Sequence, residues 1–551
     1  MCIMWKFRRR EGARAEHGSG PLTQRWPVAV VGCLVVLCIM FYSLLPSGAV
    51  AFLRTEFPWF GNSLGWMETL PDPLNLAHLA VYAGSALLVS LAMPKHVRRI
   101  DVVSATAGFV LLAIGTELLQ LSVHGRNASL VDAANNLIGV VVGCAVGWAL
   151  RIWLGRKARR LQLGGRIAAV RDWLASVICR GIVSSGPAPD DELAFVLGLA
   201  RRHGVVALVH RAMALAQPSS LPAKWLPAFA DESRALVAHS LLLRSQCAEV
   251  DRAARAADLA PIWLKGVALS TWLYPEPYLR RCADIDVLVP SHTHMLRLSQ
   301  AVERLGYRLV RRHIAGDLAV YELLARADRR GLELDIHWRL ANTPLFAERF
   351  GWEELAEAAI PLPGIGRGAR GLGPVHALIH ACMHRAVERL KSPVDHLHWL
   401  YDLHLLAGLL SPAQWTNLVQ LAGERRLAVV VLDGLRAAER AFGTALPESA
   451  ISSLKVGATS EPLRFRHLSN WLYFQWAAGR ELPTWQQRFR WVRQVLFPEW
   501  AHLRERYGDD GANSVVVAGR RIIDGVRRLW RYIAVGCRHR TQHRAEPDGI
   551  R

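Results

Sequence analysis

The sequence predicts a multi-domain protein in which a bundle of four transmembrane helices is followed by a cytosolic α+β core with helical flanking regions. Four apolar segments lie before residue 155, and strand-like runs are confined to residues 260–345. A helical repeat of apolar residues dominates the sequence on both sides of those runs. A chain of 551 residues has room for about three such domains.

The four apolar segments comprise residues 27–46, 74–93, 101–122 and 131–154. Each has about 20 residues, which as a helix are enough to cross a hydrocarbon core of about 30 Å. Lys and Arg concentrate before the first segment, after the second and after the fourth. Because positively charged loops stay in the cytoplasm, we expect an integral, multi-pass membrane protein with both termini cytoplasmic.

The charge balance narrows the choice of partners. A formal net charge of +21 fits either nucleic acid or a protein held against an anionic inner leaflet. The arginines are spread over helical stretches, without a tract of interleaved aromatic residues, so nucleic acid is the less favoured partner. The 9 cysteines are scattered and form no C-x-x-C pair, which predicts neither a disulfide framework nor a zinc ribbon.

Polar side chains inside the apolar segments need a partner or a cavity, because ionisable groups are costly at membrane depth. Small residues at Gly139 and Gly143 also have the spacing that permits close helix contact. This pattern resembles the VanZ-like family over residues 27–154. The polar residues that carry the likeness are His78, Tyr82, Glu117, Gln120, Arg126, Ser129, Asp132 and Asn136. Two roles stay open, namely a network that holds four helices in register and a binding site for a lipid or head group.

The composition divides the chain into seven regions. A basic N-terminus (1–26) precedes the four-helix membrane domain (27–154), a basic juxtamembrane linker (155–189), a helical part (190–259), the α/β core (260–345), a second helical part (346–512) and a basic amphipathic tail (513–551). The tail contains too many arginines to span a bilayer. A helix lying on the inner leaflet and a helix packed against the core are both open for it.

Two carboxylates precede a short apolar run in CADIDVLVP, residues 282–290. Side chains at i and i+2 of a strand point to the same side, so Asp284 and Asp286 point in one direction. Asp335 adds a carboxylate from a neighbouring strand, and Glu333 on the same face is the alternative third residue. Clustered carboxylates raise one another's pKa, and divalent cations remove this conflict. The pattern therefore predicts two Mg²⁺ ions about 4 Å apart, with Mn²⁺ as a substitute.

The order of these motifs resembles the polymerase β-type nucleotidyltransferase superfamily, in which the acidic pair precedes the apolar run of its strand. A closer likeness, from about residue 190 to beyond residue 410, is to a bacterial family of uncharacterised nucleotidyltransferases. It is carried by Leu264-Lys265-Gly266, Tyr274-Pro275, Arg280 or Arg281, Leu305-Gly306-Tyr307, Asp335-x-His337-Trp338-Arg339 and Trp399-Leu400-Tyr401-Asp402. Two features depart from the superfamily. Lys265-Gly266-Val267 stands where Gly-Gly or Gly-Ser is usual, and the gap to Asp284 is longer.

The resemblance implies a role for each acidic residue. Asp284 and Asp286 would hold both metal ions. Asp335 would complete the second metal site and help to activate an acceptor hydroxyl. The polymerase β-like fold that the likeness implies would place these residues on the central sheet of the core.

The same resemblance implies a nucleotide site. Gly266 would let the backbone approach the triphosphate with Lys265 as a charge partner, and Arg280 or Arg281 would reach a phosphate. We therefore expect a membrane-tethered, Mg²⁺-dependent nucleotidyltransferase of the bacterial inner membrane. It would move an NMP group from an NTP to an unidentified acceptor, for which the tether alone suggests an envelope polysaccharide or a lipid-linked intermediate. The alternative is a VanZ-like binding or resistance protein, directed at glycopeptides or lipids, with a catalytically inactive tail.

Histidines crowd one later stretch of the chain. His380 and His384 are four positions apart, which suits zinc on a helix. No glutamate follows His380, so the metalloprotease signature is absent. We favour helix-packing and substrate-facing roles for these residues over a separate metal site.

Overall fold

The computed structural model describes residues 76–93, 99–123, 129–180, 192–216, 224–311, 322–327, 333–391, 394–463, 470–496 and 519–525, together with a few isolated positions. The chain divides into two compact units, residues 1–165 and residues 166–551.

The first unit contains fewer candidate membrane spans than we predicted. Its described helices are α4 (Leu76–Ala92), α5 (Arg99–Gln120) and the first part of α6 (Leu130–Arg180). Within the described residues, two stretches are long and apolar enough to cross a membrane, Val103–Gln120 and Leu130–Leu154. The prediction of four spans is therefore wrong for the described part of the chain. Helix α4 has 17 residues, which is too short, and most of segment 27–46 lies outside the described residues.

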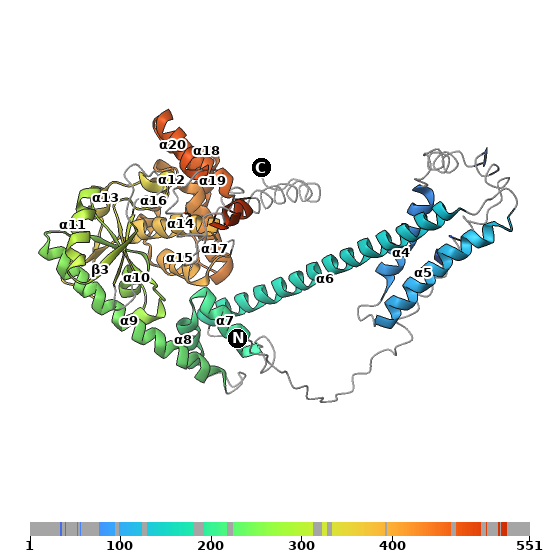
Figure 1. Ribbon diagram of the computed structural model, residues 1–551. Helices are drawn as coiled ribbons and strands as arrows, with labels where there is room; N and C mark the ends of the chain where they lie inside the picture. Colours follow the sequence, from blue (N-terminus) through green and yellow to red (C-terminus); the bar gives the residue numbers. More distant parts are fainter. Residues whose placement is uncertain are drawn as a thin grey trace. The chain divides into compact units, whose positions relative to one another are not determined.

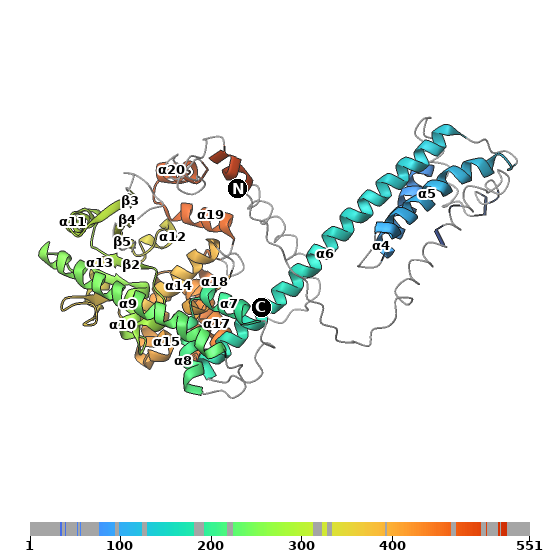
Figure 2. The same cartoon turned by 60° about the horizontal axis from the view of Figure 1, so that its bottom comes forward.

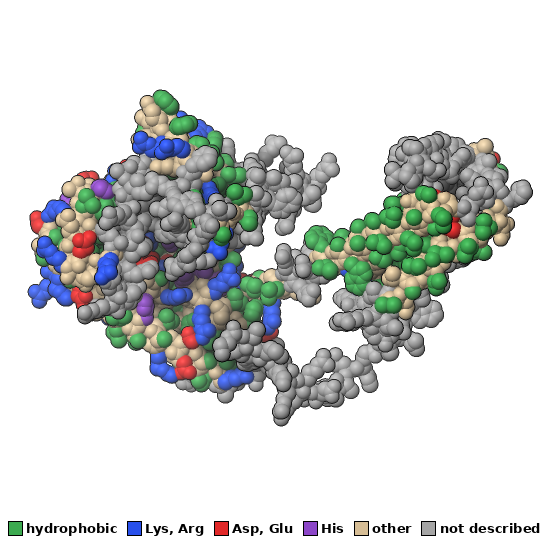
Figure 3. Space-filling model, viewed as in Figure 1, with side chains coloured by type: hydrophobic (Ala, Val, Ile, Leu, Met, Phe, Trp, Pro, Cys, Tyr) green, Lys and Arg blue, Asp and Glu red, His purple; other side chains and the backbone are tan. Residues whose placement is uncertain are grey.

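Close backbone contact joins α6 to α4. A Cβ atom on Gly139 would lie 2.6 Å from the Leu79 carbonyl oxygen, and one on Gly147 would lie 2.6 Å from Cβ of Ser90. Such contacts require glycine, and small residues of this kind allow helices to approach closely. The two candidate spans are apolar, and only 28% and 22% of their residues are buried. Most of their apolar surface is therefore exposed. Figure 3 shows hydrophobic side chains over the described helices of this unit.

Helix α6 is longer than the sequence suggested. It continues without a break through the predicted boundary at residue 154 and through most of the predicted juxtamembrane linker. Its last residues belong to the second unit, where Val170, Leu174 and Val177 are buried in the core. One continuous helix thus replaces a membrane helix followed by a separate surface helix.

Within the described residues, the second unit is built on a mixed sheet of seven strands. A mixed sheet was predicted for the core. Its strand order is β3-β4-β5-β2-β1-β7-β6, with β2 and β5 parallel and β1 antiparallel to β2. The strands are β1 (Ile262–Leu264), β2 (Asp284–Leu288), β3 (Tyr307–Arg311), β4 (Glu322–Ala327), β5 (Glu333–His337), β6 (Ile360–Pro361) and β7 (Arg370–Gly371). The five longer strands match the predicted runs, whereas the short β6 and β7 were not predicted.

Helices cover both faces of the sheet (Figure 1). On one face, Ile285, Val287, Leu334 and Ile336 form a core with α9 (Trp225–Ala256) and α11 (His292–Glu303). On the other face, Ile262 and Leu264 of β1 and Leu288 of β2 join a larger core with the C-terminal helices. The two-residue period of the strands therefore separates two apolar cores.

The remaining helices form the rest of the second unit. They are α7 (Leu193–His203), α8 (Val206–Ala216), α10 (Lys265–Trp272), α12 (Pro344–Ala347), α13 (Trp352–Glu357), α14 (Pro374–Lys391), α15 (Leu397–Leu409), α16 (Pro412–Glu424), α17 (Ala428–Phe442), α18 (Glu448–Ser460), α19 (Trp471–Glu481) and α20 (Trp485–Leu496), with a 3-10 turn at Pro277–Leu279. Figure 2 shows α14, α15, α17 and α18 close together beside the sheet. Predominantly helical flanks were predicted on both sides of the core.

Candidate active site

The central pair of strands brings the predicted carboxylates together. Strands β2 and β5 pair in parallel register, with Asp284 opposite Glu333, Asp286 opposite Asp335 and Leu288 opposite His337. Since alternate residues share a face, Asp284, Asp286, Asp335 and His337 lie on the face opposite Ile285 and Ile336. The apolar pattern of the two strands thus selects the side on which the polar residues meet.

Three of these residues form a compact group of metal-ligand type. Asp286, Asp335 and His337 each offer one ligand atom, and these atoms all lie within 4.8 Å of one another. The Nε2 atom of His337 lies 2.9 Å from Oδ1 of Asp286, and both residues are 2% exposed. We call Asp286, Asp335 and His337 the acidic cluster.

Lys265 supplies the positive charge beside the cluster. It is the first residue of α10 and has φ of 48°, a left-handed conformation that costs a non-glycine residue about 1 kcal/mol. Its Nζ atom donates to Oδ1 of Asp286 over 2.6 Å. The next residue, Gly266, is tightly packed, because a Cβ there would lie 3.1 Å from Sγ of Cys282. The turn after β1 therefore directs an ammonium group at the cluster.

Burial and charge separate the two aspartates of β2. Burial raises the pKa of Asp284 to about 6, and the neighbouring charge of Asp286 adds to the increase. Burial alone would raise the pKa of Asp286 as well. The Lys265 ammonium and the His337 imidazole outweigh that effect and hold the pKa of Asp286 well below its usual range. Asp286 therefore stays ionised at a pH where Asp284 has already taken up a proton.

A histidine from α14 lies near the same charges. Burial, together with the nearby Lys265 ammonium, lowers the pKa of His380 to about 3. His380 is therefore neutral at physiological pH. It also lines a pocket between α10, α14 and α15, together with Lys265, Trp272, Arg280, His384 and Trp399. This pocket borders the acidic cluster through Lys265, which touches both.

The two predicted phosphate-binding arginines lie away from the acidic cluster. Arg280 is 9% exposed and donates to both carboxylate oxygens of Asp402, at 2.8 to 3.1 Å. The Tyr274 hydroxyl donates to Oδ1 of the same carboxylate over 2.6 Å. Arg281 donates from Nη1 to the Arg201 carbonyl oxygen over 3.1 Å and stays exposed. In the structure, neither guanidinium contacts the cluster, although Arg280 lines the neighbouring pocket.

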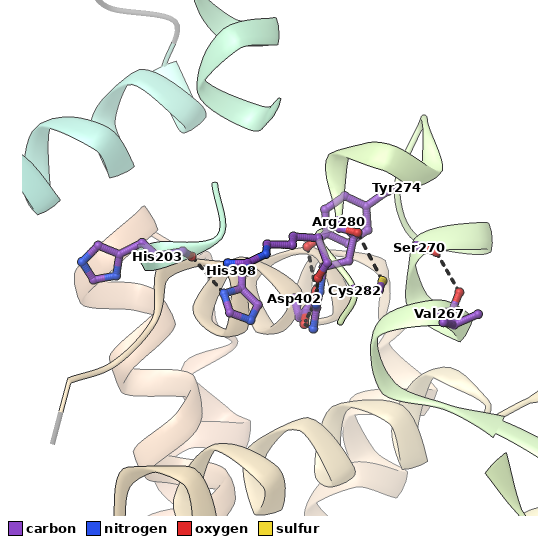
Figure 4. Close-up of polar contacts among 9 residues, drawn as sticks. His203, Val267, Ser270, Tyr274, Arg280, Cys282, His398 and Asp402 are labelled. Carbon is purple, nitrogen blue, oxygen red and sulfur yellow. Dashed lines mark hydrogen bonds and ion pairs between the residues drawn. The ribbon is translucent and has the colours of Figure 1, made fainter. Parts of the chain in front are cut away.

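Two histidines extend this buried contact toward α7 (Figure 4). Nδ1 of His398 donates to the His203 carbonyl oxygen over 2.9 Å. Burial lowers the pKa of His398 well below its usual value, and the nearby Arg280 guanidinium contributes. We call Tyr274, Arg280, His398 and Asp402 the arginine network. It joins the segment between α10 and β2 to α15.

The cluster differs in membership from the predicted trio. Asp284 shares the face but not the compact group, and His337 takes the third place. His337 lies two positions after Asp335, so the period of the strand already placed it on this face. Glu333, the alternative third ligand, pairs with Asp284 and is outside the group of three.

The polar residues of the first unit also find partners. The hydroxyls of Tyr82 and Thr116 are 2.7 Å apart, and Nδ2 of Asn136 donates to Oε1 of Glu117 over 3.0 Å. The Ser129 backbone N–H donates to the other carboxylate oxygen of Glu117 over 3.3 Å. These contacts join α4 to α5, and α5 to α6. Gln120 is buried and Asp132 is half-buried on the same helices, whereas Arg126 and the side chain of His78 lie outside the described residues.

Comparison with known proteins supports the predicted activity of the second unit. Residues 189–443 match a family described as an uncharacterised nucleotidyltransferase. The matched region contains the sheet, the acidic cluster and the arginine network. It supports a nucleotidyltransferase activity, as predicted from the motifs, and with it a nucleotide substrate. No curated protein and no solved structure matches the chain. The VanZ-like part of the resemblance stays a prediction.

Proposed function

We propose that the chain is a membrane-tethered nucleotidyltransferase in which the acidic cluster holds a divalent cation beside the bound NTP. The observation that carries this proposal is the convergence of Asp286, Asp335 and His337 within 4.8 Å, inside the region that matches the family. In the proposed reaction, an acceptor oxygen bonds to the α-phosphorus of the NTP. The bond from that phosphorus to the oxygen bridging to the β-phosphate breaks, and pyrophosphate leaves.

The donor atoms of the cluster fit a divalent metal ion. Two carboxylates and one imidazole lie close enough to share one cation. The buried Asp286 carboxylate needs a neutralising charge, and Asp335 beside it is half-buried. The imidazole of His337 extends the choice from Mg²⁺ to Mn²⁺, since nitrogen donors suit transition metals better. When bound, the ion would neutralise phosphate charge and make the acceptor hydroxyl easier to deprotonate. Asp284, on the same face, would extend the site toward a second ion.

The residues of the chain would divide the remaining tasks. The Asp335 carboxylate would accept the proton that the acceptor hydroxyl loses as its oxygen bonds to phosphorus. The Lys265 ammonium would move from Asp286 to the triphosphate, because the incoming cation takes over the neutralisation of that carboxylate. Tight packing at Gly266 would keep the turn close to the phosphates. The aromatic pocket beside Lys265 would hold the rest of the nucleotide.

The proposals for the acceptor and for membrane attachment depend on the helices of the first unit. Two apolar helices with mostly exposed surfaces favour a protein that remains in the membrane. A reaction centre attached to such an anchor would act on an acceptor at the membrane, and we propose a hydroxyl of an envelope glycan or of a lipid-linked intermediate.

The test is transfer of label from α-labelled NTPs by the purified full chain, with Mg²⁺ or Mn²⁺ and candidate acceptors. The wild type should transfer label, and Asp286→Asn should not. Glu333→Gln is the matched control, because it neutralises a carboxylate on the same face but outside the cluster. Saturable NTP binding without any transfer, in all metals and with all acceptors, would favour the alternative of an inactive tail.

A further inference from the structure

Helix α20 presents two different faces. Trp491 is buried against α19, where its ring lies 2.9 Å from the position a Cβ on Gly479 would take. Its Nε1 atom donates to the Gln475 carbonyl oxygen over 3.0 Å. Val495 packs against the same core, and Arg521 donates to its carbonyl oxygen over 3.0 Å. One side of α20 is thus firmly attached to the protein.

A second side of α20 is apolar and uncovered. Trp485, Phe489, Val492 and Leu496 are 72%, 68%, 52% and 58% exposed. Their spacing of four, three and four positions places all four on one narrow stripe of the helix. Trp491 lies roughly a third of a turn away from this stripe, so the contact of α20 with α19 leaves the stripe exposed. We call these four residues the α20 stripe.

Charge identifies what could cover the stripe. Arg488, Arg490 and Arg493 are exposed on α20, and the helix contains no acidic residue. Two copies of such a surface would repel each other, so a symmetric contact between two chains is disfavoured. In Figure 3, basic and hydrophobic side chains lie next to one another over this helix. A row of Trp, Phe and Leu bordered by arginines is typical of helices that lie in the headgroup layer of anionic membranes.

We propose that α20 is a membrane-surface helix whose stripe enters the headgroup region of an anionic leaflet. The described end of the chain extends the surface, since Arg521 contacts α20 and the neighbouring Ile522 and Ile523 are 66% and 53% exposed. A second membrane contact from the transferase unit would hold it against the bilayer independently of the apolar helices before residue 155. The proposal does not depend on catalysis.

Photo-crosslinking in the full chain tests it directly. The chain with Phe489→p-benzoylphenylalanine is mixed with phosphatidylcholine vesicles, with and without phosphatidylglycerol, irradiated and analysed by mass spectrometry. The matched control is Val456→p-benzoylphenylalanine, because Val456 is an apolar residue of α18 that is 72% exposed. We expect lipid adducts at position 489 but not at position 456, with a higher yield when phosphatidylglycerol is present.

Further variants separate charge from apolar contact. In the chain labelled at position 489, Arg490→Gln with Arg493→Gln should lower the phosphatidylglycerol-dependent yield by about fivefold for each arginine removed. Adducts at position 489 with a second copy of the chain, or with α19, would overturn the proposal. Lipid adducts no more frequent at position 489 than at position 456 would overturn it as well. Nucleotide transfer is not part of the readout, so an inactive enzyme would not obscure the result.

Discussion

Two buried aspartates of the transferase unit are neutralised in opposite ways. Asp402 is 3% exposed, and both of its oxygens are bound by the forked guanidinium of Arg280, with Tyr274 adding a further donor. Asp286 is 2% exposed, but Oδ1 alone takes the contacts from Lys265 and His337. The first carboxylate is enclosed by fixed donors. The second is held by a single flexible ammonium and an imidazole.

This difference separates a structural ion pair from an exchangeable one. The Arg280 side chain is 8% exposed and its planar fork matches a carboxylate in one geometry. The Lys265 side chain is 22% exposed and carries a point charge on a flexible stem, so it can leave without unfolding its surroundings. We therefore expect the arginine network to control stability and the acidic cluster to control chemistry.

The largest expected effect is on catalysis. Asp286→Asn should lower the transfer rate by about a thousandfold, equivalent to about 4 kcal/mol, because it removes the charge at the centre of the cluster. The same variant should lower the free energy of unfolding by less than the Arg280 variant described next, because the Lys265 ammonium that loses its partner is 22% exposed and can reach water. Rate assays and urea unfolding of the full chain measure both quantities. A fully active Asp286→Asn enzyme would remove the cluster from the mechanism.

The arginine network should show the reverse behaviour. Arg280→Met leaves the Asp402 carboxylate buried without its cation and should lower the free energy of unfolding by about 3 kcal/mol. The double variant Arg280→Met with Asp402→Leu should recover most of this loss. Urea unfolding gives the free energies, and the metal affinity of the folded variants should stay unchanged. A phosphate-binding role for Arg280 would instead appear as a higher KM for the NTP with normal stability.

A smaller effect follows from the histidine that borders the arginine network. Burial, followed by the charges of His396 and nearby arginines, lowers the pKa of His203 to about 4. In the unfolded chain this histidine has a pKa near 6.5. Between about pH 6.5 and pH 4 the unfolded state therefore binds more protons than the folded state, and the free energy of unfolding decreases as the pH falls. Between about pH 7 and pH 5, His203 alone should contribute a loss of roughly 2 kcal/mol.

His203→Asn tests this pH dependence, because the Asn side-chain oxygen can replace Nδ1 as the acceptor of the Leu397 N–H. Unfolding midpoints of this variant should depend less on pH than those of the wild type. His292→Asn, at an exposed histidine of α11, should leave the dependence unchanged. Equal slopes for His203→Asn and the wild type would contradict the assignment.

The smallest expected effect concerns the exchange of cations. Lys265→Met removes the ammonium that occupies Asp286, so Mn²⁺ should bind about tenfold more tightly in the absence of nucleotide. The same variant should transfer label more slowly, since the triphosphate loses a charge partner. Calorimetric titration measures the affinity, and Arg281→Met is the control because that arginine contacts a distant backbone oxygen. Weaker Mn²⁺ binding in Lys265→Met would show that the lysine is not a competitor.

Local patterns predicted the sheet well. The alternation of polar and apolar residues in CADIDVLVP and GLELDIHWRL was sufficient to place Asp284, Asp286 and Asp335 on one face, as the register confirms. Strands β6 and β7 have two residues each, too few for any periodicity to appear. The acidic pair and its neighbouring strand therefore followed from the sequence, and the sheet edge did not.

Contacts between distant residues were beyond sequence reasoning. The Arg280–Asp402 pair joins positions 122 residues apart, and the Lys265–Asp286 pair depends on a left-handed lysine. Neither spacing nor composition reports such contacts. The arginines were therefore predicted to bind phosphate because their charge is visible in the sequence and their partner is not.

Helix lengths were misjudged for a different reason. The basic residues after the fourth apolar segment suggested a separate juxtamembrane linker at residues 155–189, yet α6 continues through most of it to Arg180. Hydropathy records where apolar residues end, and a helix can continue as long as its backbone hydrogen bonds are made. The 20-residue apolar segment 74–93 also led us to predict a membrane span, whereas α4 has 17 residues.

The parallel pairing of β2 with β5 also governs when the acidic cluster can form during synthesis. The ribosome releases Asp286 well before His337, which follows it by 51 positions, and α11, β3 and β4 must fold in between. A nascent chain therefore carries a lone acidic strand with little affinity for cations. Binding of the proposed cation would become possible only when β5 pairs with β2, so it would report the completion of the sheet rather than its beginning.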